Sequence, residues 1–343
     1  MSYNYNSTEL LISQQLKATD NQTAEVLHDV KPVRVHGQRA EEQPWRLRRA
    51  QAELLSNAYI TIGNLSKAAR VAACAGWLIF SPPSEEQRMK LQKAQFCRVR
   101  LCPMCQWRRS LKIYGQTTQI INAANASRKG GYAWIMLTLT QRNVPGESLS
   151  AELDRISRAW QRLQHRKEWQ AAVKGWMKCI EITHNLKNNT YHPHIHALLM
   201  VMPSYFTGRT YITRARWAQL WQECAQLDYT PSVWITKSYG DKARQIAEVS
   251  KYASKPDDYI IVDDWELTAD SIQTLDAACA KRRFLAYGGK LKEIKQQLAL
   301  EDIESDSADL VHTGADDTPE ISDEMAGILY QWVPGIKNYY RTK

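Results

Sequence analysis

Short runs of hydrophobic residues, separated by polar segments, occur along the middle of the chain and predict strands. An apolar run at 132–140 is bounded by glycines before it and by a turn after it, which is typical of a buried strand. Similar runs at 177–183 and 195–201 are joined by the polar loop 185–190, so we expect an antiparallel hairpin. A shorter run at 232–236 fits a fourth strand.

Segments with helical periodicity lie between these predicted strands. Leu153, Ile156, Trp160 and Leu163 recur at steps of three and four residues and make one apolar face. Residues 216–227 repeat the pattern, and 241–254 are expected to form a third helix. Interleaved elements of this kind predict an α+β fold, an antiparallel sheet backed by helices. A further helical region, 46–73, leads into a stretch rich in cysteine and arginine.

The flanking regions have a different character. The first residues are polar with little periodicity, and the region after the sheet is strongly acidic. The last residues are aromatic and basic, and we expect them to dock back onto the body. The predicted organisation is a flexible arm (1–44), a helical cysteine-bearing module (45–125), the α+β domain (126–298), a solvated acidic linker (299–325) and a C-terminal segment (326–343).

The distribution of charge along the chain narrows the range of possible functions. The net charge is +9, but ten of the 36 acidic residues lie in 301–324, where no Lys or Arg occurs. The remainder therefore carries +19, which suits a polyanionic partner such as DNA, although a merely soluble basic protein would look the same by charge alone. No apolar run is long enough to span a membrane and no secretory signal is visible, so a cytoplasmic protein without a membrane partner is expected.

Four of the seven cysteines predict a structural zinc site. Cys102 and Cys105 have the two-residue spacing of a zinc knuckle, and Cys97 and Cys74 complete a four-thiolate set. Reduced, buried cysteines are the alternative, and it is the interpretation given to Cys179, Cys224 and Cys279. The residues beside the knuckle are expected to bind DNA by gripping phosphate, reading guanine or stacking on a base: Arg98, Arg100, Trp107, Arg108 and Arg109. Packing in the core is the alternative for Trp107.

A second metal site is predicted on the hairpin. His194 and His196 are two residues apart, so on a strand both side chains point to one face. A turn centred on 187–188 places Glu181 opposite His194, and a turn one residue later places it opposite His196. His192 precedes Pro193 and is expected to lie outside the ligand set, in a structural or supporting role. Histidines merely exposed on a strand are the alternative.

Two imidazoles and a carboxylate leave coordination positions open, as in a catalytic site for Mn²⁺ or Mg²⁺. The same ligands could hold Fe(II) in an oxygenase, so the ligands alone do not fix the reaction, and a candidate nucleophile is needed to tell the two apart. On the helix expected at 241–254, Glu248 and Tyr252 are four residues apart and Lys255 follows three later, so the three would share one face. A surface helix stabilised by such pairs is the alternative.

These motifs, in this order, resemble the plasmid rolling-circle replication initiators of the His-hydrophobe-His (HUH) endonuclease superfamily, in the branch with one tyrosine and a glutamate. The resemblance covers about 70–298. It implies that Tyr252 nicks origin DNA with a metal held by the histidine pair, forming a covalent 5′ adduct, and that Glu248 activates water at termination. The matching segments are Leu137–Thr140, His192–His196, Glu248–Tyr252 with Lys255, Phe96–Arg109 and Tyr287–Lys290.

The chain has no P-loop motif, so unwinding is expected to need a host helicase, with a host DNA polymerase extending the free 3′ end. The resemblance is compatible with a homodimer. Two alternatives remain open: a transposase or conjugative relaxase with the same chemistry, and a non-catalytic zinc-dependent regulator that binds DNA.

Overall fold

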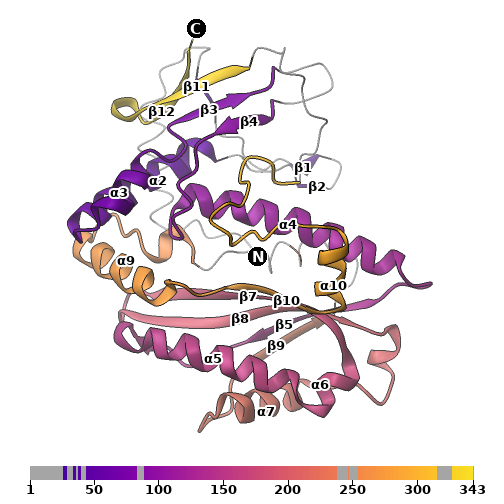
Figure 1. Cartoon of the computed structure of the whole chain (residues 1–343). Helices are drawn as coiled ribbons and strands as arrows, with labels where there is room; N and C mark the ends of the chain where they lie inside the picture. The colour runs from indigo at the N-terminus through magenta and orange to yellow at the C-terminus, as the bar shows by residue number, and fades with distance from the viewer. Residues whose placement is uncertain are drawn as a thin grey trace. The chain divides into compact units, whose positions relative to one another are not determined.

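The computed structural model describes residues 26–28, 34–35, 38–39, 44–82, 89–237, 246, 254–314 and 327–342 (Figure 1). The chain clusters into two compact units. Unit 1 comprises Met1–Arg109, Lys255–Gln273 and Asp309–Lys343, and unit 2 comprises Ser110–Ser254 and Thr274–Ala308. Helices α4 (Pro103–Ala126) and α9 (Trp265–Cys279) contribute residues to both units, so neither unit is one continuous stretch of sequence.

Unit 2 is built on a six-stranded sheet with the order β10-β7-β8-β5-β9, in which β6 also pairs with β8. Every pairing is antiparallel, as the sequence predicts. The strands are β5 (Ala133–Leu139), β6 (Val144–Pro145), β7 (Val173–Asn185), β8 (Thr190–Val201), β9 (Val233–Lys237) and β10 (Leu285–Gly289).

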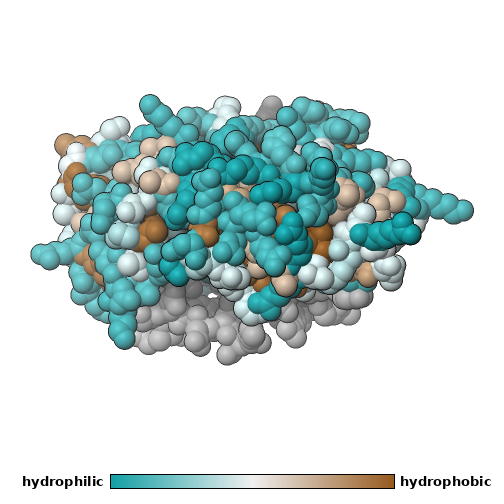
Figure 2. All heavy atoms as spheres, turned by 90° about the horizontal axis from the view of Figure 1, so that it is seen from below, coloured by the Kyte–Doolittle hydropathy of each residue, from teal (hydrophilic) through white to brown (hydrophobic). Residues whose placement is uncertain are grey.

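One face of this sheet is covered by α5 (Leu149–Gln164), with α6 (Lys167–Ala172) and α7 (Arg214–Ala225) beside it (Figure 1). The predicted apolar face of α5 is buried, and Trp160 lies at its centre, edge-on to Trp169 and Trp176. Truncating a buried tryptophan of this kind typically costs about 3–5 kcal/mol of stability. Seen from below, this side of the molecule is mostly hydrophilic, with hydrophobic residues in separate patches (Figure 2).

The opposite face of the sheet packs against the unit 2 part of α4, where the Thr117 hydroxyl lies 3.3 Å from the sulfur of Met177. α10 (Lys290–Gln297) contacts β7 and β10. Gly288 is needed here because the ring of Trp176 lies 2.2 Å from where a Cβ would be. Gly289 has a φ of +54° at the start of α10, a conformation that favours glycine.

The β7–β8 hairpin is longer than its apolar runs suggest, since polar residues extend both strands to Asn185 and Thr190. The turn is shaped by its asparagines: the Asn185 carboxamide accepts from the amide of Lys187, and Asn189 adopts a φ of +45°. The turn is therefore centred on Lys187–Asn188, the first of the two alternatives from the sequence.

Unit 1 contains a four-stranded antiparallel sheet with the order β12-β11-β3-β4. The expected docking of the C-terminal segment is confirmed, because β11 pairs directly with β3. The expected helix at 46–73 is broken at Gly63 (φ +75°), after which the Asn64 side chain caps the second helix. The elements are α2 (Trp45–Thr61), α3 (Leu65–Ala72), β3 (Trp77–Phe80), β4 (Leu91–Ala94), β11 (Ile328–Val333) and β12 (Asn338–Arg341), with a short β1–β2 ladder at Arg34–Val35 and Gln38–Arg39.

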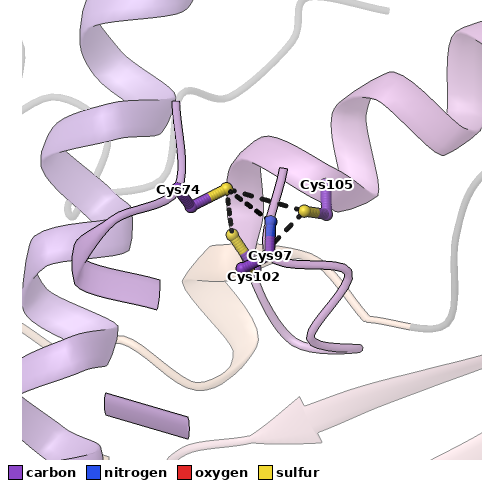
Figure 3. Close-up of side chains that lie close together, drawn as sticks. All are labelled: Cys74, Cys97, Cys102 and Cys105. Carbon is purple, nitrogen blue, oxygen red and sulfur yellow. Dashed lines mark hydrogen bonds between the residues drawn. The ribbon is translucent and has the colours of Figure 1, made fainter. Parts of the chain in front are cut away.

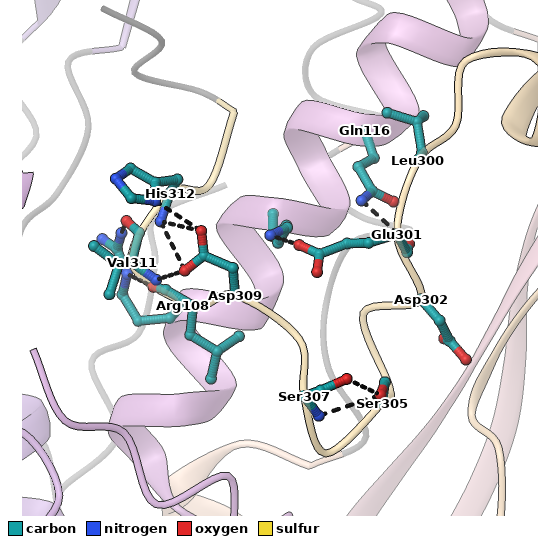
Figure 4. Close-up of polar contacts among 12 residues, drawn as sticks. Arg108, Gln116, Leu300, Glu301, Asp302, Ser305, Ser307, Asp309, Val311 and His312 are labelled. Atoms are coloured by element: carbon teal, nitrogen blue, oxygen red, sulfur yellow. Dashed lines mark hydrogen bonds and ion pairs between the residues drawn. The ribbon is translucent and has the colours of Figure 1, made fainter. Parts of the chain in front are cut away.

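The acidic segment differs from its prediction as a solvated linker over its described part, 301–314. Ile303 and Leu310 are each 1% exposed. In unit 2, the Glu304 carboxylate accepts the main-chain N–H groups of Phe284 (3.0 Å) and Leu285 (3.1 Å). Figure 4 shows the segment's polar contacts, among them that of Gln116 with Glu301. The Glu301 carboxylate also pairs with the ammonium of Lys112. These residues are held by their own buried apolar side chains and by basic partners that are distant in the sequence. Composition alone does not reveal such contacts. None of the described helices is both long and apolar enough to cross a membrane.

Candidate metal centres

The hairpin brings three potential metal ligands together in unit 2. Glu181 on β7 lies directly opposite His194 on β8, and His196 lies two pairs along the ladder, opposite Cys179. Directly opposed side chains in an antiparallel ladder share one face. All three residues are buried, with exposures of 3% for Glu181, 9% for His194 and 7% for His196. The predicted triad is therefore assembled by strand register.

The ligand atoms converge on one point. The Oε2 atom of Glu181 lies 2.9 Å from Nε2 of His196 and 3.3 Å from Nε2 of His194. The opposite ring nitrogens are anchored: Nδ1 of His194 donates to the main-chain oxygen of His192 (3.0 Å), and Nδ1 of His196 lies 3.1 Å from the hydroxyl of Thr138. A proton on each Nδ1 leaves the Nε2 lone pair free to bind a metal.

This donor set fits a divalent ion with open coordination positions, because one protein oxygen and two nitrogens occupy only part of its coordination sphere. His192 stays outside the ligand group, as expected, and contributes its carbonyl oxygen. Burial, followed by the nearby His194, lowers the pKa of His192. The contact with Nδ1 of His194 gives His192 the supporting role that the sequence predicts.

The four cysteines meet in unit 1 (Figure 3). Cys74 follows α3, Cys97 follows β4, and Cys102 and Cys105 flank the start of α4. The Sγ atoms are 3.6 Å apart in the pairs Cys74–Cys105, Cys97–Cys105 and Cys74–Cys102. Zn–S bonds of about 2.3 Å at tetrahedral angles put sulfurs about 3.8 Å apart, so the arrangement fits Zn²⁺.

The surroundings of the cluster suit thiolates. Main-chain N–H groups of Cys97 and Arg98 donate to the sulfurs of Cys74 (3.4 Å) and Cys105 (3.2 Å). Burial raises the pKa of the Cys74 thiol; burial also acts on Cys105, but hydrogen bonds from the other cysteines outweigh it and lower the pKa of Cys105. Buried thiols of high pKa need a cation to become ligands, and zinc supplies that charge.

Two tyrosines that the sequence did not single out hold the loops of this cluster. The hydroxyl of Tyr259 donates to the carbonyl of Leu101, and that of Tyr339 donates to the carbonyl of Ala75 at 2.6 Å. Both side chains are fully buried. Their fixed positions explain how sequence-distant segments complete the module.

Comparison with known proteins identifies the chain's relatives. A family model described as a replication protein matches residues 88–340. The chain is 38% identical over 325 residues to Protein rep of Bacillus amyloliquefaciens, covering 87% of this chain and 94% of that relative. It is 36% identical over 307 residues to Protein rep of Lentilactobacillus hilgardii (87% and 95% covered) and 34% identical over 308 residues to Protein rep of Streptococcus pneumoniae (88% and 93% covered). The chain belongs to this family of replication proteins. No solved structure matches it.

The arginines proposed for DNA contact in this replication protein are not all on the surface. Arg108 and Arg109 are only 5% and 4% exposed. Arg108 donates to the carbonyls of Leu310 (2.9 Å) and Val311 (2.7 Å), and Arg109 donates to the carbonyl of Arg98. Their burial counts against the expected phosphate contacts, because the first turns of α4 pack inward at the cysteine cluster.

The other members of that group are partly exposed. Arg98 donates to the carbonyl of Phe96, and the carbonyl of Arg100 accepts from Gln106. The ring of Trp107 lies edge-on to that of Trp45, with the two ring centroids 4.6 Å apart. DNA contacts by Arg98, Arg100 and Trp107 remain predictions.

Glu248 and Tyr252 lie outside the described residues. Lys255 is described, and its expected place on the same helix face is wrong. Its backbone is extended (φ −81°, ψ 149°) and it precedes the short 3₁₀ turn η3 (Pro256–Asp258). Proline disfavours the helical conformation of the residue before it, which accounts for the extended backbone of Lys255 before Pro256. That signal was present in the sequence.

Proposed function

We propose that this replication protein nicks and rejoins DNA to start rolling-circle replication of a plasmid. The observation that carries the proposal is the buried pair of imidazoles with anchored Nδ1 atoms and a shared carboxylate partner, Glu181, in a chain of this family. A basic body that suits the DNA backbone supports it. The antiparallel sheet with helices on its faces is the architecture expected of an HUH endonuclease.

In the proposed reaction, the Tyr252 hydroxyl oxygen attacks a DNA phosphorus atom. A phosphotyrosine bond to the 5′ side forms, the bond to the 3′ oxygen breaks, and the proton lost by the phenol ends on that leaving 3′-hydroxyl. A divalent ion held by Glu181, His194 and His196 would polarise the phosphate and offset charge on its oxygens. The new ester conserves the energy of the broken bond, so strands can be rejoined without ATP.

Glu248 is proposed to accept a proton from water at termination, which allows a second cleavage without a second tyrosine. Lys255 is proposed to offset the charge of the Tyr252 phenolate. The free 3′ end would be extended by a host polymerase, with a host helicase unwinding the duplex.

The test is incubation with Mn²⁺ and single-stranded oligonucleotides that tile the replicon, labelled at the 3′ end because that fragment stays on the protein. We expect a covalent adduct with the wild type and none with Tyr252→Phe. Tyr211→Phe is the matched control, because Tyr211 is 51% exposed, whereas Tyr259 is fully buried and its loss would disturb the cysteine cluster. Equal nicking by the His194→Ala, His196→Ala double variant would overturn the metal site.

The same assay separates the alternatives. A non-catalytic zinc-dependent regulator would bind the same DNA and never cut it. A transposase or relaxase would cut a transposon end or a transfer origin and leave the plasmid replication origin intact. An Fe(II) oxygenase would form no DNA adduct, and the relationship to replication proteins counts against it.

A further inference from the structure

A large exposed aromatic side chain lies in line with the proposed metal site. Trp234 on β9 is 59% exposed, the most exposed tryptophan among the described residues. β9 is an edge strand of the described sheet and pairs with β5 alone. Tryptophan has one of the largest apolar surfaces of any side chain, so its exposure at a sheet edge indicates a binding surface.

Strand register places this indole on the face that carries the metal ligands. Trp234 lies opposite Thr138, and Thr138 lies opposite His196. Opposed residues share a face, and the 3.1 Å contact between Thr138 and His196 bears this out for the inner pair. At about 4.8 Å per strand, Trp234 is roughly 10 Å from His196, a distance that a few nucleotides of unpaired DNA can span.

A cation accompanies the ring. The guanidinium carbon of Arg214, at the start of α7, lies 4.5 Å from the centroid of the Trp234 ring. Its Nε donates to the carbonyl of Val233 at 2.7 Å, which fixes the guanidinium beside the edge strand. A planar cation on an aromatic ring is a combination that binds unpaired nucleic acid, because bases stack on the ring and the cation attracts the backbone.

We propose that Trp234, supported by Arg214, stacks on an unpaired base flanking the phosphate to be cut, and so positions single-stranded DNA at the metal site. This rests on the proposed function, because the DNA and the nick define which base is meant. A ring binds any base by stacking, so Trp234 sets the position of the strand and not its sequence.

The test combines protein variants with DNA that lacks single bases. The oligonucleotide of the replicon that binds most tightly is end-labelled and prepared with one abasic site at each position in turn, and its binding is measured in a Tyr252→Phe background, which prevents cutting. One or two abasic positions should weaken binding by the wild-type Trp234 protein by roughly five- to hundredfold, the range typical of base stacking. Trp234→Ala should bind intact DNA as weakly as that and show no further loss at those positions.

Trp234→Phe, which keeps a ring, should retain most of the effect, and Trp234→Leu, which keeps bulk without a ring, should lose it. Trp77→Ala, an exposed tryptophan on a strand of unit 1, should leave the abasic profile unchanged. An unchanged Mn²⁺ affinity shows that the triad is intact in each variant.

Additive effects of Trp234→Ala and every abasic site would overturn the proposal, as would a change in oligomeric state that accounts for the lost binding. If the wild-type protein nicks DNA but the effects of Trp234→Ala and of the abasic sites on binding are additive, only the stacking role fails. If the base-specific coupling appears but no oligonucleotide is ever cut, the proposed function fails and the stacking site stands.

Discussion

Glu181 and His194 face each other across the β7–β8 hairpin, with Oε2 of the carboxylate 3.3 Å from Nε2 of the ring. This pairing depends on strand register, and register depends on the asparagine-shaped turn. A slip of one residue would move the carboxylate to the opposite face. The candidate metal centre is therefore as well defined as the hairpin that carries it.

The Thr138 hydroxyl is expected to hold His196 for metal binding. Thr138→Val keeps the shape of the side chain but removes the partner of Nδ1, so the affinity for Mn²⁺ should fall about 10- to 100-fold. Calorimetric titration with Mn²⁺ measures this directly. Thr138→Ser keeps the hydroxyl and should bind like the wild type; equal affinity in Thr138→Val would show that the contact does not orient the ring.

How far the sequence predicted this centre can be judged from particular residues. The two-residue periodicity of strands and the position of the turn were enough to bring Glu181 to the histidine pair. Arg108 is predicted to contact DNA but is buried, and its hydrogen-bond partners, Leu310 and Val311, are about two hundred residues away in the sequence. Local patterns determine strand faces, whereas the burial of a long polar side chain depends on tertiary contacts that no local pattern contains.

Zinc should be needed for unit 1 to fold. Because the four sulfurs bring together segments after α3, after β4 and at α4, Cys102→Ser should lose bound zinc and lower the thermal unfolding temperature, and a strong chelator should do the same to the wild type. Metal content by mass spectrometry and calorimetric scanning are the measurements. Cys279→Ser, at a buried thiol outside the cluster, should keep its zinc. Full folding of zinc-free protein would contradict the assignment.

Glu304 should contribute strongly to the stability of unit 2. Its carboxylate accepts two main-chain N–H groups at the start of β10, and hydrogen bonds to charged groups contribute about 1.5–3 kcal/mol each. Glu304→Ala should lower the free energy of unfolding by about 3 kcal/mol or more in urea titrations. Asp306→Ala, at an exposed carboxylate of the same segment, should have almost no effect. Equal stability of the two variants would mean that the segment is not held by Glu304.

Lys178 should make stability depend on pH. Burial lowers the pKa of its ammonium from 10.5 to about 8. Between these values the unfolded chain binds more protons than the folded one, so the free energy of unfolding should rise with pH by up to about 3 kcal/mol. Below pH 8 both states are protonated and the cost of burying the charge is constant.

Lys178→Met should remove this rise and be more stable than the wild type at pH 7, where the buried charge is present only in the wild type. Unfolding titrations of both proteins from pH 7 to pH 10.5 provide the comparison, and subtraction cancels the other titrating groups. Parallel curves for the two proteins would contradict a depressed pKa at Lys178.

The central claim is that Tyr252 becomes joined to DNA. After reaction with Mn²⁺ and the cleaved oligonucleotide, nuclease trimming and protease digestion, mass spectrometry should find a nucleotide phosphate on the peptide that contains Tyr252. The wild-type protein should carry this modification at that tyrosine alone, and the His194→Ala, His196→Ala variant should lack it. A nucleotide on any other residue, or DNA cut by the wild type with no modified peptide, would contradict the account.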